Sequence, residues 1–454
     1  MGQFENKALQ AFAEKLDAQG VKLPLSEHTE VLAQPLAIGA HTMHNRIAVQ
    51  PMEGCDGTAD GRPAEPTVRR YMRFARGGAG LIWFEATAVC REGRANPRQL
   101  WLTPETLDDF RRLADQIREE AVKANGYAPL LILQATHSGR YSKPEGRPDP
   151  LIAYNNPLFE GGTPIPAERI VPDEYLDRLV EQMGAAAALA EKAGFDGVDI
   201  KSCHRYLASE LLSAYTRPGR YGGSFENRTR FLRSAVQAAE QATGSDFIVT
   251  SRLNVYDGFP YPYGFGVAEG GGLTPDLSEP ERLVSLLCAE SGLKLLDVTI
   301  GNPYVNPHVN RPANHYPYAC GESPLTGLAR MVSCVSAIQK SAPDLAVIGS
   351  GLSYPGAMAP YLAAGGVEQG CFAVAGFGRA SFAYPDFPRD ILQKGAVDAA
   401  RCCVACGKCS ELMRAGSIAG CVVRDSAYYL PYYKRDVLKK EDCARWQPCR
   451  KLPW

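Results

Sequence analysis

Residues 173–202 have the sequence DEYLDRLVEQMGAAAALAEKAGFDGVDIKS, and this stretch decides the fold. Its first part, 173–192, repeats apolar residues at helical spacing and predicts an amphipathic helix. Its last part, 197–202, is a short apolar run that predicts a buried strand. A long helix that leads at once into a buried strand is the repeating unit of a parallel sheet covered by helices.

The same unit recurs along the chain in both directions. Apolar runs predict strands at 46–51, 81–86, 130–137, 197–202, 247–254, 295–302, 346–351 and 371–376. Helical patterns lie between them, for example at 106–123, 226–242 and 280–291. Eight units favour a closed (β/α)8 TIM barrel of the α/β class over an open doubly wound sheet. No GxGxxG follows any predicted strand, which weakens the Rossmann alternative.

The ends of the chain differ in character from this repeat. Residues 1–30 predict a helical N-terminal extension, and 31–395 form the barrel. From 396 to 454 the sequence becomes rich in cysteine and then basic and aromatic. We therefore expect a C-terminal extension with a site of its own.

Composition excludes several classes of function. The chain has 454 residues, of which 45% are hydrophobic and 22% charged, and its net charge is −1. Such a balance favours no nucleic-acid or membrane partner. The first residues lack the features of a signal peptide, and no apolar stretch is long enough to span a bilayer. We therefore expect a cytoplasmic protein, and the sequence leaves a homo-oligomer open.

Polar residues follow nearly every predicted strand, where a barrel enzyme assembles its site. These positions are Glu53, Glu85, Gln134, His137, Lys201, His204, Tyr206, Arg252, 302–308, Ser350 and Arg379. After the seventh and eighth strands, the sequence offers Ser350 with Gly351 and Gly378 with Arg379. Loops at these two places commonly bind phosphate through backbone N–H groups, and an arginine adds a bidentate donor. Two ordinary glycine turns are the alternative.

Four cysteines form the sharpest local motif, with the spacing C-x2-C-x2-C-x11-C. They are Cys403, Cys406, Cys409 and Cys421. Three thiolates in a tight loop and a fourth further along favour a [4Fe–4S] cluster. Zinc is the competing interpretation, although zinc sites usually contain two CxxC pairs, and free thiols are a third. Cys443 and Cys449 are expected to be structural.

Several of these segments together resemble a known family. They are LAQPLAIGAHTMHNRIAVQPM (32–52), ARGGAGLIWFEATAV (75–89), LQATHSGRYSKPEG (133–146), AGFDGVDI (193–200), TRPGRYGGSFENRTRFL (216–232), VIGSGL (347–352) and GFGRASFAYPDFP (376–388). The order and the amino-acid sequences of these segments resemble those of the old yellow enzyme (NADH:flavin oxidoreductase) family over roughly residues 31–425. The four cysteines narrow the resemblance to the iron–sulfur branch, which includes 2,4-dienoyl-CoA reductase and trimethylamine dehydrogenase. The C-terminal dinucleotide-binding domains of those enzymes have no counterpart in this sequence.

The resemblance implies an FMN site. Pro51, Met52, Glu53 and Ala86 would line the flavin ring, Gln134 would bond its pyrimidine edge, and Arg252 would lie near N1. Ser350, Gly351, Gly378 and Arg379 would hold the phosphate. The cysteine that carries covalent flavin in trimethylamine dehydrogenase aligns with Glu53, so FMN is expected to bind non-covalently.

The resemblance also implies a catalytic set. Tyr206 matches the tyrosine that protonates the substrate carbon after hydride arrives from flavin N5, and a core tyrosine is the alternative. His308 aligns approximately with a catalytic histidine of 2,4-dienoyl-CoA reductase. His204 keeps one of the two usual substrate-gripping positions, whereas Lys201 replaces the other. That extra cation favours an anionic or strongly polarised acceptor, unless Lys201 simply pairs with Glu53.

These residues predict an FMN-dependent ene-reductase that acts on an activated alkene. Electrons would come through the cluster from a separate donor, either ferredoxin or a flavoprotein reductase. Such a donor could dock on the late basic residues, although a solvated charged tail is the simpler interpretation. These residues are Lys434, Arg435, Lys439, Lys440, Arg445, Arg450 and Lys451.

Two rival functions remain open. An amine dehydrogenase or demethylase of the trimethylamine dehydrogenase type would run in the opposite direction. Trp83, Tyr261, Tyr263 and Tyr304 are candidates for the aromatic cage that an alkylammonium group would need. The second rival is a flavin–cluster electron-transfer protein with no substrate of its own.

Overall fold

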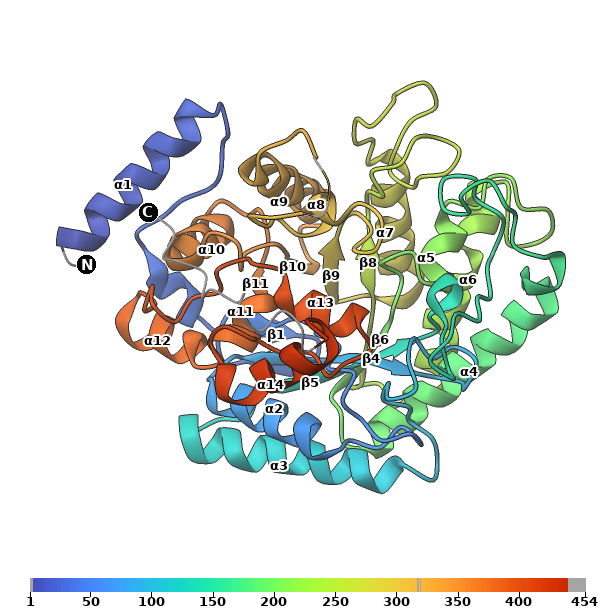
Figure 1. Ribbon diagram of the computed structural model, residues 1–454, viewed down its shortest axis with the longest axis horizontal. Helices are drawn as coiled ribbons and strands as arrows, with labels where there is room; N and C mark the ends of the chain where they lie inside the picture. Colours follow the sequence, from blue (N-terminus) through green and yellow to red (C-terminus); the bar gives the residue numbers. More distant parts are fainter. Residues whose placement is uncertain (1–2, 317, 319, 440–454) are drawn as a thin grey trace.

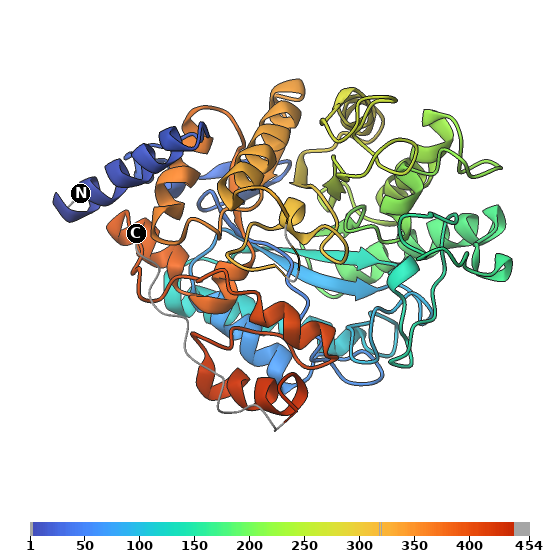
Figure 2. The same cartoon turned by 45° about the horizontal axis from the view of Figure 1, so that its top comes forward.

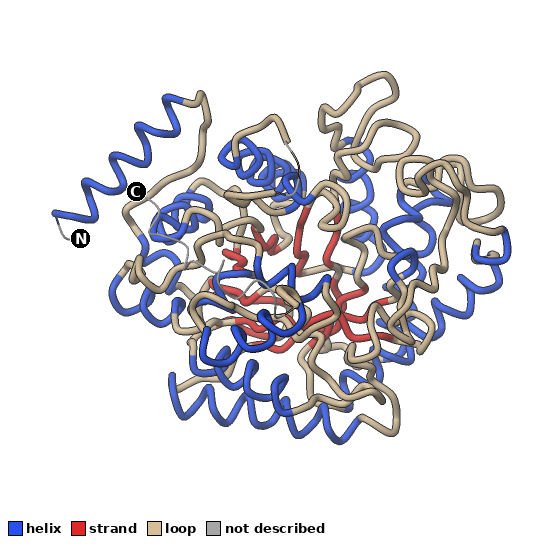
Figure 3. Tube along the Cα trace, viewed as in Figure 1, coloured by secondary structure: helices blue, strands red, loops and turns tan. Residues whose placement is uncertain are grey.

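A computed structural model describes residues 3–316, 318 and 320–439. The predicted TIM barrel is confirmed, because parallel strands ring the centre of the molecule and helices surround them (Figure 1, Figure 3). The barrel strands are β3 (Ile47–Val49), β4 (Leu81–Ala88), β5 (Leu130–Thr136), β6 (Gly197–Ile200), β7 (Ile248–Thr250), β8 (Arg252–Asn254), β9 (Leu295–Thr299), β10 (Ala346–Gly349) and β11 (Val374–Phe377). Each predicted strand corresponds to one of these, with one predicted run split in two.

The split strand closes the barrel. Neighbouring strands follow the order β7-β6-β5-β4-β3-β11-β10-β9-β8, so β7 and β8 stand at the two ends of this order. Only Ser251 separates them along the chain, and it joins both sides. Its hydroxyl donates to the carbonyl of Ile200 at 2.8 Å, and its own carbonyl accepts from the N–H of Asp297 at 3.1 Å.

Helices cover the outside of the ring. The long ones are α2 (Glu65–Arg76), α3 (Leu107–Asn125), α4 (Asp173–Lys192), α6 (Phe225–Ala242), α7 (Ser278–Ser291), α9 (Pro324–Ser341) and α10 (Ala359–Glu368). Shorter ones are α5 (Leu207–Leu212), α8 (Pro307–Asn310), α11 (Arg379–Ala383) and α12 (Phe387–Lys394). Within the described residues, no helix has both the length and the apolar character that crossing a bilayer requires.

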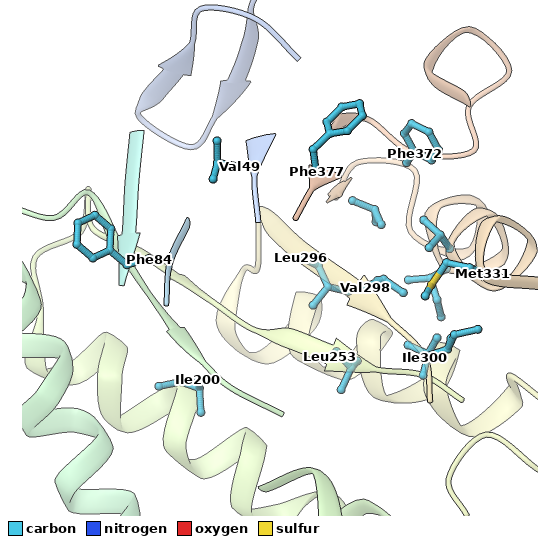
Figure 4. Packing of buried hydrophobic residues seen from close by; sticks show 14 of the residues in the cluster. Val49, Phe84, Ile200, Leu253, Leu296, Val298, Ile300, Met331, Phe372 and Phe377 are labelled. Atoms are coloured by element: carbon cyan, nitrogen blue, oxygen red, sulfur yellow. The ribbon is translucent and has the colours of Figure 1, made fainter. Parts of the chain in front are cut away.

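Alternation along the strands divides the core into two layers. In β4, Ile82 and Phe84 pack outward against the helices, whereas Trp83 faces the barrel interior. Figure 4 shows part of the outer layer, with Phe84, Leu253, Val298 and Met331 among its labelled members. Burial of each such side chain contributes about 1.5–3 kcal/mol. The interior layer includes Ile38 and Met43, from the hairpin strands β1 (Leu36–Ile38) and β2 (His41–Met43) that precede the barrel.

The terminal segments add to this frame. The N-terminal helix α1 (Gln3–Ala18) buries Leu9, Phe12 and Leu16 against the body of the protein. At the other end, α13 (Lys408–Arg414) and α14 (Ser426–Asp436) lie side by side and share a small apolar cluster (Figure 2). The main-chain N–H of Ala419, between them, bonds the carbonyl of Gly54 at 2.7 Å. The cysteine-rich segment is therefore fastened to the loop that follows β3.

Candidate active site

A cavity opens at the carboxyl ends of the barrel strands, with an empty volume of about 980 Å³ that includes its part open to solvent. It gathers all of the residues expected to hold the flavin, three of the four expected catalytic residues and one of the four expected cluster cysteines. Those that line it are Pro51, Met52, Glu53, Ala86, Gln134, Lys201, His204, Tyr206, Arg252, Ser350, Gly351, Gly378, Arg379 and Cys409. Residues from far apart in the chain meet here because parallel strands end at one mouth of a barrel.

One wall of the cavity carries a partly buried carboxyl, that of Glu53. Burial raises the pKa of Glu53, while the charge of Lys201 and a hydrogen bond from Asn96 oppose the rise. Asn96 Nδ2 donates to Glu53 Oε1 at 2.8 Å. Lys201 lies over Tyr206, with its Nζ 3.8 Å from the ring centroid. Desolvation lowers the pKa of Lys201, and the cation–π contact compensates part of its lost hydration.

Gln134 is oriented by a residue that the sequence analysis did not single out. Asp199 accepts hydrogen bonds from Gln134 Nε2 at 2.6 Å, from Trp83 Nε1 at 2.8 Å and from the main-chain N–H of Arg252 at 2.6 Å. Burial raises the pKa of Asp199 to about 7. Because the amide nitrogen of Gln134 is engaged there, its oxygen is the group available to a ligand. The sequence feature that could have revealed Asp199 is its place as a carboxyl inside the otherwise apolar strand β6.

Arg252 and the residues after β10 form a second network. Arg252 Nε lies 3.0 Å from Asp297 Oδ2. Gln50 Nε2 donates to Asp297 Oδ1 at 2.8 Å and to Ser350 Oγ at 2.6 Å, and Ser350 Oγ donates to the carbonyl of Val298 at 2.6 Å. The Ser350 hydroxyl is thus engaged within the protein. This leaves the main chain of 350–351 as the part of this turn that can meet an anion.

The far end of the cavity is cationic. Arg379 Nη2 donates to the carbonyl of Pro312 at 2.7 Å, and Gly351 has a φ of +85°. A Cβ atom on Gly378 would lie 3.0 Å from Met52 Sδ, so any larger residue there would crowd Met52. Desolvation and repulsion from Arg379 and Arg414 lower the pKa of Arg311 to about 10. Such crowding of guanidinium groups is typical of a site built to hold an anion.

Arg311 was missed from the sequence. It follows His308 by three positions, and the sequence analysis predicted His308 rather than Arg311 as a site residue of this loop. His308 lies on α8 outside the cavity lining, where its Nδ1 is 2.7 Å from the hydroxyl of Tyr318. The structure therefore does not bring His308 to the other predicted catalytic residues. Tyr304, which precedes α8, lines the cavity in its place.

Tyr206 is fully buried, and its hydroxyl lies 2.9 Å from that of Tyr304. Burial and the charge of Glu53 raise its pKa well above the ordinary value, so it is a neutral phenol at pH 7. His204 and Arg205, just before it, have φ values of +64° and +58°, in a region that non-glycine residues seldom adopt. Arg205 is anchored by Asp257 at 2.8 Å, which helps to hold this uncommon turn.

The protonation of His204 follows from the same surroundings. Burial, together with the positive charges of Arg252, Lys201 and Arg311, lowers its pKa well below the ordinary value. His204 is therefore a neutral imidazole that can donate one hydrogen bond into the cavity.

Among the four aromatic residues suggested for an alkylammonium cage, only Tyr304 lines this cavity. Trp83 is buried beneath it, and Tyr261 packs on Tyr215 with ring centroids 4.8 Å apart. The four suggested residues therefore do not come together as a cage in this cavity.

The cysteine motif lies beside the cavity. Ala405 and Gly407 adopt left-handed conformations that turn the loop tightly before Cys409 reaches the cavity wall. The N–H of Ala405 lies 3.4 Å from Cys403 Sγ, and the N–H of Arg424 lies 3.3 Å from Cys421 Sγ. Amide donors of this kind stabilise sulfur that carries negative charge.

The thiols influence one another electrostatically. Burial raises the pKa of Cys421 to about 12, and the charges of Cys403 and Cys409 add to the rise. Four thiolates suit a cation that they would share. In the described ranges, however, no three His, Cys, Asp or Glu side chains are grouped closely enough to hold a metal ion. The chemistry of the motif thus fits a cluster, while its binding stays a prediction.

Part of the predicted C-terminal surface lies outside the described residues. Lys440, Arg445, Arg450 and Lys451 of the late basic run belong to that part, as do Cys443 and Cys449. Lys434, Arg435 and Lys439 lie within the described range, on α14 or just after it.

Comparison with known proteins gives a consistent result. The model of the NADH:flavin oxidoreductase / NADH oxidase family matches residues 31–266. The NADPH dehydrogenase of Geobacillus sp. (strain WCH70) is 32% identical over 276 residues, which is 60% of this chain and 73% of the relative.

Solved structures share the fold. A 2-naphthoyl-CoA reductase in complex with 2-naphthoyl-CoA superposes with a TM-score of 0.71 at 21% identity, over 87% of this chain and 57% of the other. The old yellow enzyme homologue from Zymomonas mobilis gives a TM-score of 0.59 at 22% identity, over 81% of this chain and 94% of the other. This chain therefore spans little more than half of the length of the reductase.

Proposed function

Since this chain belongs to the NADH:flavin oxidoreductase / NADH oxidase family, we propose that it is an FMN-dependent ene-reductase. It would reduce an activated carbon–carbon double bond. The observation that carries the proposal is the buried Tyr206 hydroxyl, which shares one cavity with the residues expected to hold the flavin. When bound, FMN would supply a hydride to the alkene carbon. Tyr206 would give its proton to the adjacent carbon.

The cavity suits FMN along its whole length. Pro51, Met52 and Ala86 line the cavity and would offer an apolar surface to the flavin ring. Gln134 would offer an oxygen to the ring, and Arg252 would supply a positive charge beside it. At the other end, Gly351, Gly378 and Arg379 would hold the phosphate, with the main chain of Ser350 beside them. We add Arg311 to this end, because its guanidinium is crowded by those of Arg379 and Arg414.

Two residues would hold the substrate. His204, as a neutral imidazole, would donate to a carbonyl oxygen and draw electrons from the double bond. Lys201 places a cation next to Tyr206 and favours an acceptor that is anionic or strongly polarised. An enone or enoate that bears a carbonyl or carboxylate fits both contacts.

The cysteine segment would bring in the electrons. We propose that Cys403, Cys406, Cys409 and Cys421 hold a [4Fe–4S] cluster, which when bound would pass single electrons. Cys409 lines the cavity proposed to hold the flavin, which supports electron entry from this segment. A separate donor, ferredoxin or a flavoprotein reductase, would deliver the electrons. In this proposal, residues 1–30 are a helical extension, 31–395 the catalytic barrel and 396–454 the electron-entry segment.

Anaerobic stopped-flow spectroscopy tests the proposal. Reconstituted enzyme, reduced with dithionite, is mixed with enones, enoates and enoyl-CoA esters while flavin absorbance is followed. Oxidised enzyme is mixed with tertiary amines in parallel. The variant is Tyr206→Phe. The matched control is Tyr215→Phe, which removes a hydroxyl bonded to Glu279 outside the cavity.

An alkene should reoxidise the flavin, and Tyr206→Phe should slow this by about 10²- to 10⁴-fold, the usual contribution of a general acid. Tyr215→Phe should leave the rate unchanged. Reduction of the flavin by an amine would reverse the direction of the reaction and refute the proposal. A complete lack of response to both classes would instead favour a pure electron-transfer protein.

A further inference from the structure

The hydroxyl group of a second tyrosine, Tyr304, lies next to that of Tyr206. Tyr206 lies on the buried turn after β6, with 1% of its surface exposed, and Tyr304 lies on the loop between β9 and α8. Their hydroxyl oxygens are 2.9 Å apart, and either can donate the hydrogen bond. A distance of this size is what direct proton transfer between two hydroxyl groups requires.

The position of Tyr304 is fixed by its neighbours. Its ring stacks on that of Tyr141, with centroids 3.9 Å apart and an interplanar angle of 22°. Asn302 supports both partners, because its Oδ1 accepts from the N–H of Tyr304 and its Nδ2 donates to the Tyr141 hydroxyl, each at 2.9 Å. The Tyr304 hydroxyl is therefore aimed at Tyr206 before any substrate binds.

The buried position of Tyr206 creates a need for such a partner. Once Tyr206 has given up its proton, a phenolate is left in a place that burial and the charge of Glu53 make unfavourable. Burial and the charge of Glu53 raise the pKa of Tyr304 as well, so Tyr304 too must recover a proton from water once it has given one up. Its side chain is less deeply buried than that of Tyr206, and its neighbour Val305 is 41% exposed. The loop that carries Tyr304 thus runs from the cavity to the solvent.

We propose that Tyr304 is a positioning residue that relays protons from water to Tyr206, an inference that rests on the proposed reductase function. The O–H bond of Tyr206 breaks as its proton goes to the substrate carbon. The O–H bond of Tyr304 then breaks as the O–H bond of Tyr206 re-forms, and Tyr304 takes a proton from water. The net proton comes from solvent, and the reducing electrons come from the donor already proposed.

Burst kinetics separate this role from a structural one. Holoenzyme is mixed anaerobically with an alkene that the stopped-flow experiment has identified, with dithionite in excess, and product is quenched over the first turnovers. The variants are Tyr304→Phe and the conservative Tyr304→His. Tyr215→Phe is again the control, because it removes a hydroxyl that is bonded to Glu279 outside the cavity.

In Tyr304→Phe we expect one product per site at the normal rate, because Tyr206 starts protonated. A slow phase should follow, reduced by about 10²-fold or more and sensitive to deuterated solvent, because Tyr206 must then wait for water. Tyr304→His should abolish the burst by restoring a relay. Tyr215→Phe should behave as the parent enzyme.

A second measurement does not depend on turnover. Tyrosine is isotopically labelled at the carbon that bears the hydroxyl, and the nuclear magnetic resonance signal of Tyr206 is assigned by its loss in Tyr206→Phe. Tyr304→Phe should move this signal because the hydrogen bond is lost, and Tyr215→Phe should leave it in place. An unmoved signal in Tyr304→Phe would overturn the inference.

The kinetic outcomes distinguish the two proposals. If Tyr206→Phe slows the reaction and Tyr304→Phe shows no burst, the relay is wrong and the reductase stands. A first turnover that is as slow in Tyr304→Phe as in Tyr206→Phe would also overturn the relay, since Tyr304 would then take part in the first proton transfer. If no alkene reacts, the proposed function itself fails.

Discussion

Replacing Arg70 with methionine should destabilise the protein strongly, because the arginine is the counter-cation of two buried carboxyls. Its Nη2 donates to Asp56 Oδ1 at 2.8 Å and to Glu85 Oε1 at 2.6 Å, and its Nε donates to Asp56 Oδ2 at 3.2 Å. Exposed fractions are 3% for the Arg70 side chain, 0% for Asp56 and 1% for Glu85. Breaking a buried pair of this kind costs about 3–5 kcal/mol.

The same change should weaken cofactor binding. Glu85 Oε2 accepts the N–H of Gly54 at 2.7 Å, and Gly54 directly follows the cavity residues Met52 and Glu53. When Glu85 loses Arg70, it no longer holds this loop firmly. We therefore expect the affinity for FMN to fall together with the free energy of unfolding.

The loss of stability should grow as pH rises. Burial, which the charge of Arg70 partly offsets, raises the pKa of Glu85 to about 7, and removal of the arginine raises it further. A carboxyl with a raised folded-state pKa contributes its stability fully below the unfolded pKa and loses it as pH rises through the folded value. Each carboxyl that keeps its proton only when folded adds about 1.4 kcal/mol of instability per pH unit.

Urea unfolding at a fixed excess of FMN measures these effects at pH 5.5 and pH 8, values that lie about one to two units either side of neutral. The control is Arg69→Met on the same helix, which removes a bidentate contact between side chains that are 28% and 10% exposed. Because Asp425 keeps its ion pair with Arg73, this change should cost only about 1 kcal/mol. An Arg70→Met loss no larger than that of the control, or one independent of pH, would refute the reasoning.

Three further predictions concern the cofactor sites. Arg379→Ala should weaken FMN binding by roughly 1.5–3 kcal/mol, the worth of a hydrogen bond to a charged group; an unchanged Kd in a flavin fluorescence titration would contradict this. Cys409→Ala should lose protein-bound iron and sulfide while FMN is retained, and Cys402→Ala should keep both; retention of the full iron content in Cys409→Ala would argue against the cluster. Asp199→Asn should lower the free energy of unfolding by about 1–3 kcal/mol, because an amide N–H₂ would face the N–H donors that the carboxylate accepts. Urea denaturation checks the last of these, and a stability equal to the parent's would show that the donors have other acceptors.

Much of the fold could be predicted from the sequence, because its signals are local. The strand at 197–202 and the helix before it follow from periodicity alone, as do the other units of the barrel. The ends of the strands then indicate the site, since parallel strands in a closed barrel must finish at one mouth. For this reason Gln134, Arg252 and Tyr206 could be grouped before any coordinates were known.

Other features could not be predicted because they depend on contacts between distant segments. The approach of Tyr304 to Tyr206 spans 98 positions of sequence. His308 was favoured over Tyr304 because alignment across a loop does not show which way a short turn presents its side chains. Asp199 was overlooked because a carboxyl inside an apolar strand is recognisable only when its three donors are seen.

By itself, the sequence determined the barrel, the family and the four-cysteine motif. The apolar periodicity of helices and strands and the spacing of the cysteines can each be recognised within a short segment. Only the tertiary structure decided how the side chains pair. Lys201 lies over the ring of Tyr206, the hydroxyl of Tyr304 meets that of Tyr206, and Arg311 is close enough to Arg379 to be repelled by its charge. Whether a residue meets a partner depends on how separate loops pack over the mouth of the barrel. That packing reflects burial and charge summed over the whole chain, which no single segment contains.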